Sequence, residues 1–215
     1  MIRHRLIRSP LSLPSPTRRR LAGRIALCSL ATALATVAVF VGGALPPSPA
    51  QAQGTSGQAL ERSVKAAFLY KFLGYADFPA SAFADSAAPV TIGVVGSEEM
   101  AAELGRVVAG RQVRGRPIVV RTLREGDPAQ VHLLFVAGND NARAARVLRA
   151  AGAGLGGLLP VTECDLGLQH GSVINFRIIE ERVRFDVSLD SAERNNVKLS
   201  SRLLTVANRV VKGNS

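Results

Sequence analysis

The sequence predicts one α/β domain with a mixed β-sheet and flanking helices, preceded by an export signal. Apolar runs of strand length alternate with segments of helical period between residues 90 and 161, which predicts a β-α-β-β-α-β core. Two further strand-like runs, 173–179 and 182–189, flank Glu180-Glu181 and predict an antiparallel hairpin. A C-terminal helix is expected after the hairpin.

The first 52 residues have the composition of a signal peptide. They hold seven arginines and no acidic residue, then an uncharged apolar run of 21 residues, 25–45, and a proline-rich neck. Ala50-Gln51-Ala52 fits a signal-peptidase site, so we expect cleavage before Gln53 and a mature chain outside the cytoplasm. An uncleaved anchor is the alternative, because 21 apolar residues can span a bilayer. A loose twin-arginine resemblance at residues 17–21 leaves the export route open.

The net charge of +11 belongs mainly to this leader. Residues 53–215 hold 20 basic and 16 acidic side chains, an excess of only +4. That balance is ordinary for a small soluble domain, so no nucleic-acid partner is expected. No apolar run after residue 52 reaches membrane-spanning length, so the mature chain is not expected to span a membrane.

The first helix is expected to follow a short flexible lead at residues 53–58. From Ala59 the apolar residues recur at helical spacing and end before Pro79. They occupy more than one face of the helix, which indicates deep burial or an interface. We expect a single domain over residues 59–212.

The core pattern then continues to residue 161. Ser97 is placed to cap the first core helix, and Gly110 to end it. A second helix is expected from the turn at residues 138–141 to about Ala151. The strands are expected at 90–96, 117–123, 131–137 and 158–161.

The C-terminal segment begins with the hairpin, which we expect at one edge of the sheet. Asp190 and Glu193 predict a capping box for the last helical region. The apolar residues that align on one face of that region are Leu199, Leu203, Val206 and Val210.

No motif specifies an enzyme, a metal site or a cofactor. The glycine-rich segment 152–157 follows a helix, whereas a dinucleotide loop follows a strand. His132 and His170 have no second ligand at metal-binding spacing. Cys164, the single cysteine after residue 52, is expected to be a buried small residue.

One turn is placed where α/β proteins bind ligands. Gly138, Asn139, Asp140 and Asn141 follow a strand, at the carboxyl edge of the expected sheet. A small-molecule site is one interpretation, and capping of the next helix by Asn139 or Asp140 is the alternative.

Several segments, taken in order, resemble the YfiR/HmsC-like family of periplasmic proteins. Residues 64–72 read VKAAFLYKF and lead to Phe78-Pro79, where the family has VKAAFLYNF and an aromatic-proline pair. The blocks GSVINF at 171–176, RVRFDV at 182–187 and LSSRLL at 199–204 are similar to GGMINF, RVRFEI and LSSQLL. The resemblance covers roughly residues 60–210.

This resemblance implies a non-enzymatic regulator that binds and represses the sensory domain of an inner-membrane diguanylate cyclase. It would thereby restrain cyclic-di-GMP signalling and biofilm formation. An α/β fold and a homodimer are also implied. Some relatives sense redox state through disulfides, which Cys164 alone cannot form internally. The alternative is a periplasmic small-molecule sensor without a cyclase partner, and a hydrolase is a third, weaker hypothesis.

A partner surface is expected on the aromatic first helix and the segment after it. Aromatic side chains are common anchors of protein interfaces. Core packing is expected for at least half of them, because helical aromatics usually face the interior. The candidate residues are Phe68, Tyr70, Phe72, Tyr75 and Phe78.

Overall fold

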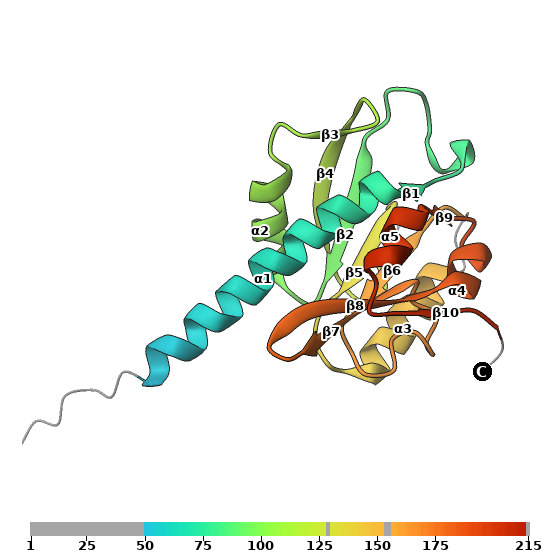
Figure 1. The fold of residues 1–215 in the computed structure, drawn as a ribbon. Coiled ribbons are helices and arrows are strands. Elements are labelled where there is room, and N and C mark those ends of the chain that lie inside the picture. Colours follow the sequence, from blue (N-terminus) through green and yellow to red (C-terminus); the bar gives the residue numbers. More distant parts are fainter. Residues whose placement is uncertain (1–49, 128–129, 153–155, 214–215) are drawn as a thin grey trace, which may run out of the picture. The chain divides into compact units, whose positions relative to one another are not determined.

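The computed structural model describes residues 50–127, 130–152 and 156–213 (Figure 1). The arginine-rich part and the apolar run of the predicted leader lie outside these residues, so the leader remains a prediction. Within the described ranges, no helix combines the length and the apolar character that crossing a membrane requires.

An eight-stranded mixed sheet forms the centre of the domain, with the strand order β10-β8-β7-β6-β5-β2-β4-β3. The core strands run parallel, whereas β8 is antiparallel to β7 and β3 is antiparallel to β4. The mixed α/β fold predicted from the sequence is confirmed. The strands of this sheet are β2 (Val90–Val95), β3 (Gln112–Val113), β4 (Arg116–Leu123), β5 (Leu133–Val136), β6 (Leu159–Thr162), β7 (Ile174–Ile179), β8 (Arg182–Ser188) and β10 (Arg209–Val211).

Helices cover both faces of the sheet (Figure 1). A separate pair, β1 (Ala76–Asp77) and β9 (Lys198–Leu199), joins the end of the first helix to the C-terminal segment. The helices are α1 (Ala50–Tyr75), the short 3-10 turn η1 (Ala80–Ala82), α2 (Glu98–Val108), α3 (Asn141–Gly152), α4 (Leu189–Arg194) and α5 (Ser201–Val206).

Two apolar clusters hold the layers together. On one face α1, α2 and α5 pack on the sheet, through residues such as Leu69, Leu104 and Leu203. On the other face α3 packs through Ala144 and Leu148. Because both faces are covered, every residue of β2, β5 and β6 is buried, which explains why these strands read as continuous apolar runs.

The centre of the larger cluster is aromatic. Phe72 of α1 lies with its ring centroid 5.0 Å from that of Phe185 and 5.8 Å from that of Phe176. Phe68, one turn earlier, lies 5.6 Å from Phe185. These contacts place α1 across β7 and β8.

The first helix is longer than the sequence indicated. It begins at Ala50 rather than Ala59, so residues 53–58, expected as a flexible lead, are helical. Glycines at 54 and 57 weaken a helix by about 1 kcal/mol each but do not terminate it. The helix therefore runs through the predicted cleavage site, Ala52-Gln53, which stays a prediction.

The C-terminal segment differs from the single helical region that was predicted. Asn196 (φ 53°) ends the α4 turn, and Ser200 caps a separate helix by accepting a hydrogen bond from the Arg202 amide. Val206 is 59% exposed and Val210 is 40% exposed, so only Leu203 of the predicted apolar face is buried.

The strand that ends this segment also displaces the hairpin from the sheet edge. β10 pairs in parallel with β8, so the β7–β8 hairpin lies inside the sheet.

The predicted capping box is wrong as well. Ser188, rather than Asp190, accepts the hydrogen bond from the Ser191 amide, and Asp190 instead accepts from Gly213 at 3.2 Å.

Candidate functional site

The strand order reverses between β2 and β5. The chain leaves β2 through α2 to reach β4 on one side, and leaves β5 through α3 to reach β6 on the other. Gly96 and Gly138 follow these two strands with φ of 88° and 92°, in the left-handed region that favours glycine. Open α/β sheets bind ligands at such a reversal, outside the carboxyl ends of the strands.

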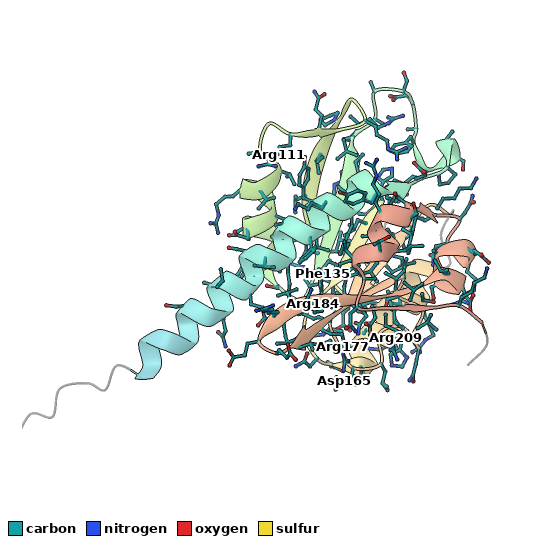
Figure 2. All side chains as sticks on the ribbon, in the orientation of Figure 1. Arg111, Phe135, Asp165, Arg177, Arg184 and Arg209 are labelled. Carbon is teal, nitrogen blue, oxygen red and sulfur yellow. The ribbon has the colours of Figure 1, made fainter. Side chains whose placement is uncertain are left out.

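A hollow of about 290 Å³ lies at this point and is covered by α1. Phe135, labelled in Figure 2, and Met100 contribute apolar surface to it. The residues around it are Gln58, Glu61, Arg62, Lys65, Gly96, Ser97, Met100, Phe135, Ala137, Gly138 and Glu163.

A charged clamp closes one side of this hollow. The Lys65 ammonium donates to Glu163 Oε2 at 2.5 Å and to the carboxylate of Glu61, one turn earlier in α1. The second oxygen of Glu163 accepts a hydrogen bond of 2.5 Å from the Gly138 amide. Glu163 therefore ties α1 to the loop that follows β5.

The clamp keeps Lys65 charged. Burial by itself would lower the pKa of Lys65, but the hydrogen bonds and charges of Glu163 and Glu61 outweigh burial and raise the pKa above its usual value. The charged ammonium therefore joins α1 to the loop after β5 through Glu163.

The predicted ligand turn is only partly at this hollow. Gly138 lines it, whereas the side chains of Asp140 and Asn141 are occupied elsewhere. Asp140 Oδ1 accepts from the Arg143 amide at 3.0 Å, and Asn141 Oδ1 accepts from the Leu166 amide at 2.9 Å. The hydrogen bond from the Arg143 amide also lowers the pKa of Asp140. Asp140 therefore caps α3, and a ligand role for the turn remains a prediction.

The clamp residues were missed by sequence reasoning, although two signals were present. Glu61 and Lys65 have the i, i+4 spacing of an ion pair on a helix. Glu163 directly follows a core strand, β6, at the same sheet edge as Gly138. Nothing in the sequence indicated that α1 crosses this edge.

The predicted partner residues fall into two groups. Phe72 is fully buried and is therefore unavailable to a partner in this structure. Phe68, Tyr70 and Phe78 are half-buried against the core, and Tyr75 is 37% exposed. A partner role for the exposed part of this set remains a prediction.

His132 has both ring nitrogens engaged. Nδ1 accepts from the Thr91 amide at 3.0 Å, and Nε2 donates to the Ala82 carbonyl at 3.0 Å. The ring stacks on Phe83 at a centroid distance of 4.3 Å, and Arg116 lies over the other ring at 3.9 Å. Burial and the Arg116 charge lower the pKa of His132 despite the hydrogen bond to Ala82. This neutral histidine anchors the 80–88 loop.

Cys164 is buried, and its burial raises the pKa of the thiol. In the part of the chain that the structure describes, no group of three histidine, cysteine or acidic side chains is placed to hold a metal ion.

A family model described as YfiR/HmsC-like matches residues 62–208. Among solved structures, a conserved domain protein from Vibrio cholerae O1 biovar El Tor is 12% identical, with a TM-score of 0.43. The alignment covers 57% of this chain and 55% of that protein, so this chain spans about half its length. No curated protein matches the chain.

Proposed function

This chain belongs to the YfiR/HmsC-like family of periplasmic regulators, and on that premise we propose that it binds and represses the sensory domain of an inner-membrane diguanylate cyclase. Repression would restrain cyclic-di-GMP synthesis and biofilm formation. The observation that carries the proposal is the family match, which runs from within α1 through α5, ends just before β10 and so includes nearly the whole folded body.

The state of the reactive side chains supports binding over catalysis. Lys65 is held protonated by two carboxylates. His132 uses both ring nitrogens in hydrogen bonds. Cys164 is buried with a raised pKa. Each condition is the reverse of what a nucleophile or a general base requires.

Export is part of the proposal. Cleavage between Ala52 and Gln53 would release a chain whose helix α1 starts near its new N-terminus. N-terminal sequencing of the protein from a periplasmic fraction tests this directly. A sequence beginning at Gln53 is expected, and an intact Met1 on a cytosolic protein would contradict it.

Deletion of the gene tests the regulatory role. Loss of a repressor raises cyclic-di-GMP and increases biofilm, and a plasmid copy of the full chain restores both. Unchanged cyclic-di-GMP after deletion, in a strain shown by immunoblot to produce the protein beforehand, would overturn the proposal.

A second function is favoured by the hollow at the strand-order reversal. Its volume of about 290 Å³ is near the lower bound of small-molecule sites. A sensory role without a cyclase partner would use this hollow. A ligand screen by thermal shift tests it, and the expected hit loses its effect in Gln58→Trp, which places a large side chain on the α1 wall of the hollow.

A homodimer is proposed on the family resemblance alone. Sedimentation of residues 53–215 over a range of concentrations decides between a monomer and a dimer.

A further inference from the structure

We propose that the open edge of β4 docks an extended, acidic segment of a protein partner as an additional strand of the sheet. The proposal rests on the proposed function in one respect: the partner is the signalling protein that this chain regulates. Three features of this edge support it: unpaired backbone groups, arginines without ion pairs, and the register of β4.

The outer side of β4 is largely free. β3 pairs only with Arg116 and Pro117, and no described residue pairs with residues 118–123 on that side. Six residues of strand offer an edge about 20 Å long, which matches one ordinary strand. Their outward N–H and C=O groups form a template for another strand.

The two faces of this edge differ in chemistry. Ile118 and Val120 pack against the core on the face that α2 covers. Val119 is 39% exposed, and Arg121 is exposed on the opposite face. The strand register also places Arg121 on the α3 side. Arg121 pairs with Gly93 of β2, so the two residues share one face of the sheet. A Cβ atom at Gly93 would meet Leu123, which packs on the α3 side.

Two arginines on the α3 side have no carboxylate partner among the residues that the structure describes. These are Arg121 and Arg124, and both are exposed. Arg124 borders the same small depression as Ala150, which places it beside α3. Of the two nearby carboxylates, that of Asp127 accepts a hydrogen bond of 2.8 Å from the Arg124 amide, and that of Glu125 is bound by two other arginines.

Those two arginines are Arg143, whose Nε lies 2.9 Å from Glu125 Oε1, and Arg146, whose Nη2 lies 3.2 Å from Glu125 Oε2. The positive charge that remains beside the β4 edge therefore calls for carboxylates from outside the chain. Guanidinium groups bind carboxylates in a bidentate manner, which adds geometric selectivity to the charge.

Charge also excludes a second copy of this chain as the occupant. Antiparallel pairing of two β4 edges would bring Arg121 of each copy within cross-strand reach, and like charges on neighbouring strands are destabilising. The complementary occupant has carboxylates on alternate residues, facing Arg121, and apolar residues on the α2 side.

A peptide experiment on residues 53–215 tests the docking edge without any cyclase. Hydrogen exchange of the amides of residues 118–123 is measured with a synthetic peptide of about seven alternating Glu and Val residues, and with a Lys-Val control. We expect roughly tenfold slower exchange with the acidic peptide and no change with the basic one. The variant Arg121→Glu with Arg124→Glu should reverse this preference.

The control variant carries Arg182→Glu and Arg184→Glu on the β7–β8 hairpin, where Arg184 pairs with Arg177 across the two strands (both are labelled in Figure 2). It should keep the wild-type preference. Absence of protection at 118–123, equal protection by both peptides, or protection that appears with protein concentration alone would overturn the docking edge. Failure of this experiment is distinct from failure of the proposed function, which shows as unchanged cyclic-di-GMP on deletion.

Discussion

The ammonium of Lys65 lies 2.5 Å from the carboxylate of Glu163, although the two residues are 98 positions apart in the chain. This ion pair fixes α1 on the carboxyl edge of the sheet and closes one side of the hollow there. Both side chains are largely buried, at 9% and 16% exposed, so the pair is better shielded than a surface ion pair.

Glu163→Gln tests the contribution of this clamp to stability. It removes one of the two charges that compensate Lys65 and weakens the hydrogen bond from Gly138, so we expect a loss of about 2–3 kcal/mol in the free energy of unfolding. Urea denaturation measures it. Asp165→Asn is the matched control, because Asp165 is 82% exposed in its pair with Arg177 and should cost less than about 1 kcal/mol. Equal losses in the two variants would contradict the clamp.

Phe72→Ala separates packing from partner binding on α1. Removing this fully buried ring should cost about 3–5 kcal/mol. Tyr75→Ala, at a side chain 37% exposed, should change stability by less than about 1 kcal/mol. If Tyr75 contacts the partner, its variant folds normally but fails to restore low cyclic-di-GMP in the deletion strain. A Phe72→Ala protein as stable as the wild type would show that the aromatic cluster is misplaced.

Gly167 lies against a buried polar cluster. The Thr162 hydroxyl donates to Asn175 Oδ1 at 2.6 Å, and a Cβ atom at Gly167 would lie 2.0 Å from that hydroxyl oxygen. Gly167→Ala should therefore destabilise the protein by more than about 2 kcal/mol. Gly105→Ala in α2, where a Cβ meets nothing, should instead stabilise it by about 0.5–1 kcal/mol. Thermal unfolding of the two variants gives the comparison, and a neutral Gly167→Ala would contradict the contact.

His132 should make stability depend on pH. Its pKa in the folded protein is lowered from the ordinary value of 6.5, so the unfolded chain binds the proton more readily. The stabilisation from neutral His132 is complete above pH 6.5 and is lost as the pH falls through the lowered folded pKa. Urea denaturation at about pH 7.5 and about pH 5.5 measures this. His132→Gln should flatten the dependence, and an equally steep dependence in the variant would assign it to other groups.

The hydrophobic pattern of the sequence predicted those helices and strands that can be recognised without knowing which element packs beside them. The runs that became β2, β5 and β6 could be read from the sequence because burial on both faces leaves only apolar residues. The return of the chain as β10 could not, since Val210 has an apolar side chain that suits either a helix or a strand. Pairing with Val187 of β8 decides between them.

The position of the hollow at the carboxyl edge of the sheet could be predicted from the sequence, but the charged residues around it could not. Gly138 was placed correctly at the carboxyl edge because the strand order implied that edge. Lys65 and Glu163 were missed because their contact depends on how α1 lies over the sheet. That placement follows from the packing of Phe72 against Phe176 and Phe185, and such packing is a tertiary property.

Repression from the periplasmic side can be tested by measuring intracellular cyclic-di-GMP in two complemented deletion strains. One strain produces the full chain, and the other produces residues 53–215 without the leader, so that the folded body stays in the cytosol. We expect only the exported form to lower cyclic-di-GMP to the parental concentration. Equal lowering by both forms, or by neither, would contradict repression from the periplasmic side.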